Sequence, residues 1–204
     1  MQSQIHNVFP TLVMEFNLNA DVDTKLLQSV LLKEQTKPHP LLVNAQSSYF
    51  AGNHNILDVD HPLVKRLKEC FTNCVNAYIE TAGLTQCVIS NSWMSIMDND
   101  STLVPHRHEN SVISGAYYPK VPNNSVGLKF FNPTKIYKMC ETHQETTMYN
   151  ADNGEFPAKE GVLYLFPSWL EHGSETNQTE NRMVISFNTL NIDYYIENVF
   201  FVFA

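Results

Sequence analysis

The chain has 204 residues, of which 43% are hydrophobic and 17% are charged. This composition is typical of a globular protein and excludes a disordered chain, and no segment approaches the roughly 20 apolar residues of a membrane-spanning helix. Its 13 Lys and Arg against 21 Asp and Glu give a net charge of −8, which disfavours nucleic acid as the main partner. The polar N-terminus lacks the pattern of a signal peptide, so we expect a cytoplasmic protein without a membrane partner.

The N-terminal part of the sequence predicts one strand and two helices. Residues 9–18 favour a strand, and Asp21-Val-Asp opens a short helix with apolar residues at three- and four-residue spacing. Residues 37–60 are polar and irregular. A longer helix follows, for which we expect Asp60 as the N-cap and Gly83 at the end.

Beyond this helix the hydrophobic period changes to that of strands. Short segments rich in β-branched and aromatic residues cover residues 87–97, 111–118, 126–131, 161–166 and 182–190. Many short strands separated by turns indicate a sandwich or barrel, so we expect a mainly β (α+β) fold with helices packed on one outer face. We expect a single domain, with a strand and supporting helices in residues 1–84 and the β core in residues 85–204.

Two histidines in Pro105-His106-Arg107-His108-Glu109 form the most unusual local pattern. Side chains alternate between the two faces of an extended segment, so His106 and His108 would project to one side and Arg107 to the other. Two imidazoles that converge in this way can chelate a metal ion. The alternative is a polar loop with solvated histidines.

A distant histidine and an arginine favour the metal-site interpretation. His172 follows an apolar strand after a proline-containing turn. Two ligands close in sequence and one distant histidine are typical of the facial triad of non-haem Fe(II) oxygenases. Arg182 begins the last strongly predicted strand, beside an apolar run that favours a position at the mouth of a barrel over a surface position. An arginine there can bind a carboxylate through two parallel hydrogen bonds.

These motifs together resemble a known family. They are Trp93, residues 105–108 (PHRH), 114–118 (SGAYY), 131–133 (FNP) and 165–169 (LFPSW), His172, and residues 181–182 (NR) and 186–188 (SFN). In order and spacing they resemble the 2-oxoglutarate–Fe(II) oxygenase family of bacteria and phages, whose core layout is similar to that of prolyl hydroxylases. The resemblance covers residues 86–191, more than half of the chain.

The resemblance implies a double-stranded β-helix, a cupin-like jelly-roll barrel with iron in its mouth. It implies that His106 and His172 bind the iron and that Arg182 binds the far carboxylate of the cosubstrate 2-oxoglutarate. Tyr118 matches the position of a cosubstrate-binding tyrosine in prolyl hydroxylases, with core packing as the alternative role. Ser186 and Asn188 share a face of their strand and could line the pocket, although ordinary barrel filling is the favoured alternative.

The sequence leaves the third metal ligand open. Better-known members of the superfamily carry Asp or Glu at the position of His108, so the site here is either a three-histidine triad or one completed by Glu109. Glu109 would need a turn or bulge to reach the face of its neighbour. A third alternative is that only His106 and His172 bind iron and that water completes the shell. We favour His108 as the ligand.

We therefore expect an Fe(II)- and 2-oxoglutarate-dependent dioxygenase that uses O2, releases succinate and CO2, and hydroxylates a peptide residue or a small metabolite. One alternative is a three-histidine cupin-type dioxygenase that does not use 2-oxoglutarate, and another is a non-catalytic metal-binding jelly-roll module. The apolar residues 199–204 predict a final strand or, alternatively, a homodimer contact. No chemistry is assigned to the other five histidines, which are His6, His39, His54, His61 and His143.

Overall fold

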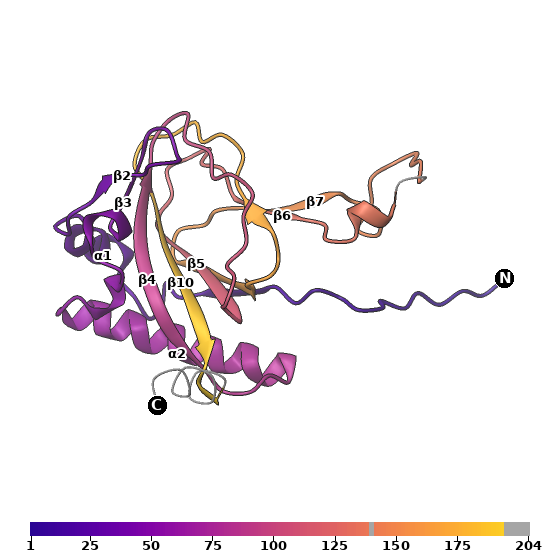
Figure 1. Cartoon of the computed structure of the whole chain (residues 1–204), viewed down its shortest axis with the longest axis horizontal. Coiled ribbons are helices and arrows are strands. Elements are labelled where there is room, and N and C mark those ends of the chain that lie inside the picture. The colour runs from indigo at the N-terminus through magenta and orange to yellow at the C-terminus, as the bar shows by residue number, and fades with distance from the viewer. Residues whose placement is uncertain (139–140, 194–204) are drawn as a thin grey trace, which may run out of the picture.

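The computed structural model describes residues 1–138 and 141–193, which form two β-sheets and their covering helices (Figure 1). The larger sheet has the strand order β1-β8-β5-β10-β4-β3-β2, and the smaller sheet has the order β7-β6-β9. The strands are β1 (Met14–Asn17), β2 (Lys37–Pro38), β3 (Ala45–Ser47), β4 (Cys87–Met97), β5 (Ile113–Lys120), β6 (Leu128–Phe131), β7 (Asn153–Phe156), β8 (Val162–Pro167), β9 (His172–Gly173) and β10 (Arg182–Asn191). The helices are α1 (Thr24–Leu31) and α2 (Pro62–Ala82), with 3-10 turns η1 (Tyr49–Ala51), η2 (Ile56–Asp58) and η3 (Lys135–Tyr137).

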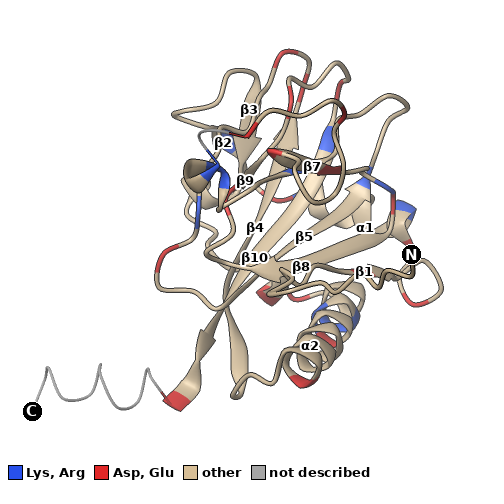
Figure 2. Cartoon of the chain, turned by 90° about the vertical axis from the view of Figure 1, so that its right-hand side faces the viewer, with Lys and Arg blue, Asp and Glu red and all other residues tan. Residues whose placement is uncertain are grey.

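Side chains alternate along the strands of the larger sheet and so contribute to two separate cores. In β8, Leu163 and Leu165 join the core that packs against α2, whereas Val162, Tyr164 and Phe166 join a core shared with the smaller sheet. The second core therefore fills the space between the two sheets, and the arrangement is the double-stranded β-helix that the resemblance implied. Helix α2 lies along the outside of the larger sheet (Figure 2), so the predicted packing of helices on one outer face is confirmed.

Helix α2 follows the periodicity of its sequence closely. Its buried side chains recur every three or four residues and include Leu67, Phe71 and Val75. Gly83 ends the helix as predicted, in a left-handed conformation with φ of 65° that glycine adopts without strain. The helix therefore presents one continuous apolar face to the sheet.

The N-cap of α2 differs from the prediction of Asp60. The cap is His61, whose Nδ1 accepts a hydrogen bond from the Leu63 amide at 3.2 Å. Asp60 instead forms an ion pair with Lys65 at 2.6 Å. His61 directly precedes Pro62, and a proline restricts the residue before it to the extended region, so the chain enters the helix at position 61.

The N-terminal part of the chain contributes more strands than its sequence predicted. Strand β1 pairs with β8 from Met14 onward, so it is shorter than the predicted strand over residues 9–18. Residues 37–60 were expected to be irregular, but they contain β2 and β3, and β3 pairs with β4 at the edge of the larger sheet. Strands of two or three residues are too short to show a hydrophobic period in a sequence.

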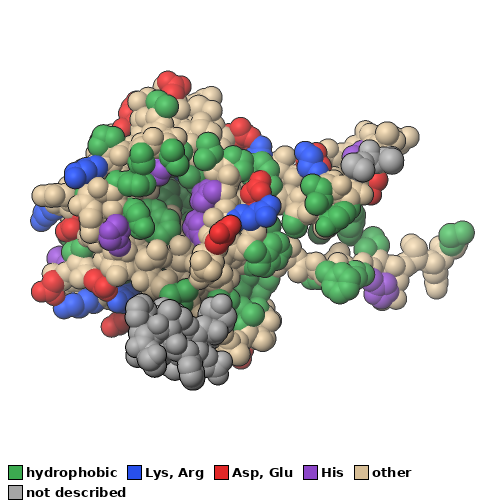
Figure 3. Space-filling view, viewed as in Figure 1, with side chains coloured by type: hydrophobic (Ala, Val, Ile, Leu, Met, Phe, Trp, Pro, Cys, Tyr) green, Lys and Arg blue, Asp and Glu red, His purple; other side chains and the backbone are tan. Residues whose placement is uncertain are grey.

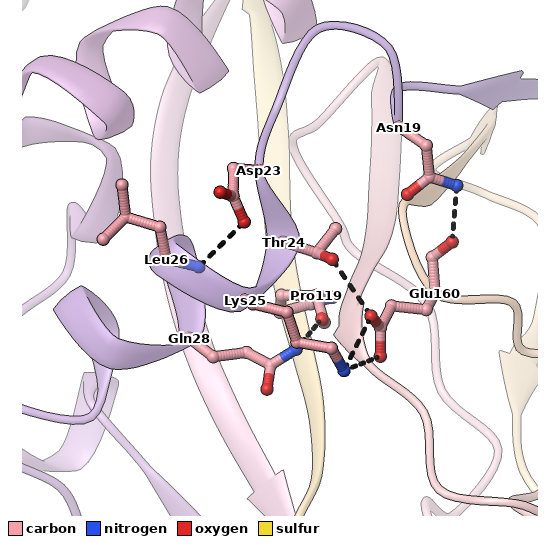
Figure 4. A network of polar contacts seen from close by, with 8 residues as sticks. All are labelled: Asn19, Asp23, Thr24, Lys25, Leu26, Gln28, Pro119 and Glu160. Atoms are coloured by element: carbon pink, nitrogen blue, oxygen red, sulfur yellow. Dashed lines mark hydrogen bonds and ion pairs between the residues drawn. The ribbon is translucent and has the colours of Figure 1, made fainter.

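A polar network around Glu160 joins α1 to the turn that precedes β8 (Figure 4). Thr24 Oγ1 donates a hydrogen bond to Glu160 Oε1 at 3.0 Å, and Lys25 Nζ forms an ion pair with the same carboxylate. Asn19 Nδ2 donates to the main-chain oxygen of Glu160 at 3.0 Å. The side chain of Asp23 caps α1, so this helix begins close to the Asp21-Val-Asp start that the sequence predicts.

The apolar residues 199–204 lie outside the described residues, so the interpretation of that segment stays a prediction. Within residues 1–138 and 141–193, no helix is long and apolar enough to cross a membrane.

Phe71 offers a test of the packing between α2 and the sheet. Its buried ring stacks on Phe187 at a centroid distance of 4.9 Å and lies 5.3 Å from the ring of Tyr117. We expect Phe71→Ala to lower the free energy of unfolding by about 3–5 kcal/mol in urea denaturation, because it leaves a cavity between helix and sheet. The matched control is Phe9→Ala, at a side chain that is 95% exposed, which we expect to change stability by no more than about 0.5 kcal/mol. Equal losses for the two variants would contradict this account of the core.

Candidate metal centre

Two short segments pair side by side and bring three histidines together. The His106 amide donates to the His172 carbonyl and the His172 amide to the His106 carbonyl, both at 3.0 Å. The His108 amide donates to the Ser168 carbonyl at 3.1 Å. The ring centroids of His106 and His172 are consequently 4.3 Å apart, and each lies 5.0 Å from the ring of His108. The predicted convergence of these side chains is thus present in the structure.

The second ring nitrogen of each histidine is held by the protein. Nδ1 of His106 and of His172 each lies 2.9 Å from a main-chain carbonyl oxygen, that of Val104 and of Leu170 respectively. A carbonyl only accepts hydrogen bonds, so Nδ1 carries the proton and Nε2 presents a lone pair. Nδ1 of His108 has two oxygen neighbours, Oδ1 of Asn188 in a short contact and Oγ of Ser114 at 3.0 Å, and Asn188 Oδ1 likewise only accepts.

These geometries fit a metal ion. The Nε2 atoms of His106 and His108 are 3.1 Å apart, and the ligand atoms of all three histidines lie within 4.8 Å of one another. Two lone pairs at this distance repel each other unless a cation lies between them. Metal–nitrogen bonds of about 2.1 Å place two neighbouring ligands roughly 3 Å apart, which is close to the observed separation.

Burial keeps two of these imidazoles neutral. It lowers the pKa of His172 to about 3, and the nearby His106 acts in the same direction. Burial also lowers the pKa of His108 to about 4, partly offset by the hydrogen bond to Asn188. Only a neutral imidazole binds a metal ion, so at neutral pH both rings are ready to act as ligands.

Arg107 and Glu109 lie outside the histidine cluster. Arg107 forms an ion pair with Glu171 at 2.8 Å, as expected for a side chain on the opposite face of the extended segment. Glu109 is exposed, and among the described residues the cluster of candidate ligands consists of histidines alone.

The three histidines line a cavity of about 130 Å³ inside the barrel. Tyr118, Arg182 and Ser186 line the same cavity, so the structure brings all the sequence-predicted site residues except Glu109 to one place. Tyr117, the neighbour of Tyr118, belongs to the core beneath α2, because successive residues of β5 face opposite sides of the sheet.

Arg182 is a buried cation without an anionic partner among the described residues. The residue is 3% exposed, and its Nε has no hydrogen-bond partner in that part of the chain. Nη1 donates to the Met97 sulfur at 2.9 Å, and the guanidinium lies 5.3 Å from the centre of the Tyr118 ring. No carboxylate within the described ranges forms an ion pair with Arg182. A buried charge left in this state is costly, so the cavity is suited to a ligand that brings a carboxylate.

Two residues at this site were not assigned chemistry from the sequence. His39 lines the cavity because the turn between β2 and β3 folds over it, with the His39 amide donating to the Ala45 carbonyl at 2.8 Å. Asn188 orients His108 from the neighbouring strand β10. Neither contact has a local sequence signal, since each joins segments far apart in the chain.

Gly173 allows the two histidine segments to approach each other. A Cβ atom at this position would lie 2.6 Å from the main-chain oxygen of Leu103, a contact that no side chain tolerates without backbone movement. The Ser174 amide donates to that same oxygen at 2.9 Å. Glycine next to His172 is therefore part of the way in which the triad is assembled.

The comparisons with known proteins agree with this site. Residues 91–188 match the model of a family described as "Putative 2OG-Fe(II) oxygenase". The fold is similar to that of HygX from Streptomyces hygroscopicus with nickel and 2-oxoglutarate bound (TM-score 0.63, 11% identity, 89% of this chain and 84% of that chain). It is also similar to a Pseudomonas putida prolyl-4-hydroxylase (TM-score 0.63, 11% identity, 88% of this chain and 93% of that chain). A viral collagen prolyl hydroxylase from Paramecium Bursaria Chlorella virus-1 is similar as well (TM-score 0.59, 10% identity, 87% of this chain and 94% of that chain). No curated protein matches the sequence.

Fold and site together define a class, the metal-dependent oxygenases built on a double-stranded β-helix. The family match covers residues 91–188, which include the triad, Tyr118 and Arg182, and it supports the assignment of this chain as a 2-oxoglutarate–Fe(II) oxygenase. It is an enzyme that uses Fe(II) and 2-oxoglutarate, as the sequence motifs implied. A cupin-type dioxygenase without 2-oxoglutarate and a non-catalytic module are not favoured.

The close contact at Gly173 yields a test of how the site is assembled. We expect Gly173→Ala to destabilise the protein by about 1–3 kcal/mol in urea denaturation, because the new methyl group forces residues 103–105 away from β9. The matched control is Gly154→Ala in β7, where a Cβ would meet nothing within 4 Å. If Gly173→Ala were as stable as Gly154→Ala, the proposed role of this glycine would be wrong.

Proposed function

We propose that His106, His108 and His172 hold the iron and that Arg182 binds the distal carboxylate of 2-oxoglutarate in the cavity that these residues share. One observation carries the proposal: a buried guanidinium without a carboxylate partner among the described residues faces the same cavity as three converging imidazoles. A dicarboxylate chelated at one end and paired with Arg182 at the other supplies the missing negative charge.

His108 is the proposed third ligand in preference to Glu109. Its Nε2 lies 3.1 Å from that of His106, and its Nδ1 is fixed by Asn188 and Ser114. Hydrogen bonds of this kind orient a metal-binding imidazole and raise its basicity. The same contacts argue against a site with only two histidine ligands, because they direct the His108 ring toward the other two.

The remaining cavity residues bind and shield the cosubstrate. The hydroxyl groups of Tyr118 and Ser186 are available as hydrogen-bond donors to its oxygens. Apolar side chains complete the wall and keep water away from the reacting groups, namely Leu103, Leu128 and Val184. When bound, the iron supplies the chemistry by which dioxygen converts 2-oxoglutarate to succinate and CO2 and oxidises the substrate.

We propose hydroxylation of a peptide residue or of a small metabolite as the outcome. The structural neighbours include prolyl hydroxylases, and HygX was also solved with hygromycin B, a small molecule, bound; these neighbours support the two substrate classes. The cytoplasmic location, the absence of a nucleic-acid or membrane partner, the single-domain organisation and the homodimer contact stay predictions.

Replacing Arg182 tests the cosubstrate site. We expect Arg182→Leu to raise the dissociation constant of 2-oxoglutarate about 100-fold, because two charge-assisted hydrogen bonds of roughly 1.5 kcal/mol each are lost. The measurement is calorimetric titration of the Zn(II)-loaded protein. An apolar residue in place of a buried ion is often tolerated, so the variant should fold. The control is Arg66→Leu, at an exposed arginine paired with Asp21 on the outer face, and an unchanged constant in Arg182→Leu would refute the assignment.

Succinate formation tests the activity and the ligand set together. We expect the wild type, given Fe(II) and 2-oxoglutarate in air, to release succinate, and His106→Ala/His172→Ala to release at least 100-fold less, because two of three metal ligands are gone. Cobalt(II) titration should show the matching loss of metal affinity. His143→Ala removes an exposed histidine outside the cluster and should retain both properties. Release of equal amounts of succinate by the wild type and the double variant would contradict the proposal.

A further inference from the structure

A second pocket lies beside the triad and opens to the outside. It has a volume of about 340 Å³, and it shares His39, Trp93, His106 and His108 with the inner cavity but does not include Arg182. Its other walls come from β3, η1, β4 and β10 and from Glu109. Figure 3 shows hydrophobic and histidine side chains around a hollow on the face seen in Figure 1. We call this space the outer pocket; of the three histidines it contacts His106 and His108.

Aromatic rings form a continuous wall of the outer pocket. The Phe50 ring lies 5.5 Å from Tyr49, the Tyr49 ring 6.0 Å from Trp93, and the Trp93 ring 5.8 Å from His108. The first two pairs are tilted by 73° and 75°, so the rings turn both edges and faces toward the pocket. Tyr49 and Phe50 are only partly covered, at 39% and 38% exposure, although such rings are normally buried. The faces of aromatic rings attract cations.

Two polar groups of the outer pocket are hydrogen-bond acceptors without a partner among the described residues, and one of them is a carboxylate. Glu109 lines it, and this carboxylate has neither an ion pair nor a hydrogen bond to any residue in the described ranges. Asn91 also lines the pocket, and its buried Oδ1 has no hydrogen-bond partner among the described residues. No Lys or Arg of the described part of the chain lines the pocket. The net charge of −8 further favours the approach of cations.

We infer that the outer pocket binds a cationic group of the substrate that carries N–H donors, such as a primary alkylammonium or a guanidinium. This inference rests on the proposed function, because the bound group would lie next to the atoms that hold the iron. Tyr49, Phe50 and Trp93 cover the alkyl part of the group and stabilise its charge through their ring faces. Glu109 provides the counter-ion, and Asn91 Oδ1 accepts one N–H. Ring faces, an unpaired carboxylate and an unpaired acceptor are a combination that a neutral or anionic substrate would leave unused.

Fluorescence of Trp93 provides the test. The chain has two tryptophans, so Trp169→Phe leaves Trp93 as the only reporter, inside the outer pocket. The protein is loaded with Zn(II), which does no redox chemistry, and with 2-oxoglutarate, and is titrated with Nα-acetyl-lysine N-methylamide. Two probes differ only at the end of the side chain: the norleucine analogue lacks the charge, and the Nε-trimethyl-lysine analogue keeps the charge without N–H donors.

We expect saturable quenching by the lysine probe at a dissociation constant at least tenfold below that of the norleucine probe. The trimethyl probe should bind more weakly than the lysine probe, because it cannot donate to Asn91. Glu109→Gln should reduce the preference for lysine over norleucine to threefold or less. Glu80→Gln changes the net charge equally at an exposed position of α2, on the outside of the larger sheet, and should keep the full preference.

Equal binding of the lysine and norleucine probes, or no quenching by either, would overturn the inference. A preference that survives in Glu109→Gln would overturn the role of Glu109, and a trimethyl probe that binds as tightly as lysine would overturn the role of Asn91. Calorimetric titration of the same samples with 2-oxoglutarate reports separately on the inner cavity. Failure of the proposed function therefore appears as lost 2-oxoglutarate binding, whereas failure of this inference leaves that binding intact.

Discussion

The pair of main-chain hydrogen bonds between His106 and His172 is the contact on which the site depends. It fixes two segments as neighbours although 66 residues separate them, and the bond from the His108 amide to Ser168 extends the pairing by one step. Once the backbones are aligned, the pleat of an extended chain turns all three rings to one side. The hydrogen-bond partners of Nδ1 then select the tautomer: main-chain carbonyl oxygens for His106 and His172, and side chains for His108. Backbone geometry thus orders the three histidines before a metal ion binds, so metal binding costs little conformational entropy.

The strands of the larger sheet connect this centre to the rest of the protein. In β10 the residues that face α2 alternate with those that face the barrel interior, and the interior set contains Arg182 and Ser186. Register therefore decides function: a shift by one residue would bury the guanidinium beneath the helix and turn core side chains toward the cavity. The packing of α2 against the outer face holds that register, which links the stability of a distant helix to the position of Arg182, the residue proposed to bind the cosubstrate.

The sequence predicted the parts of this molecule whose signals are local. The long strands β4 and β10 and the helix α2 were located within a residue or two, because their hydrophobic periods extend over several turns or pleats. His-x-His and the segment around His172 indicated the ligands, and family resemblance supplied the pairing. His39 could not be predicted, because β2 and β3 bring it to the cavity only through a few hydrogen bonds at a sheet edge. The choice of His61 over Asp60 as a cap depended equally on local geometry, namely the restriction that Pro62 imposes.

The absence of a carboxylate from the described histidine cluster has a consequence for the order of events. In the proposed site, three neutral ligands leave both positive charges of a divalent ion uncompensated in largely buried surroundings. The dicarboxylate cosubstrate then also serves as the counter-ion. Bound metal raises the affinity for 2-oxoglutarate, and bound 2-oxoglutarate raises the affinity for the metal by the same factor. Such reciprocity makes the enzyme responsive to the joint supply of metal and 2-oxoglutarate, and an enzyme short of either one releases the other. A triad with its own carboxylate would retain metal more independently of its cosubstrate.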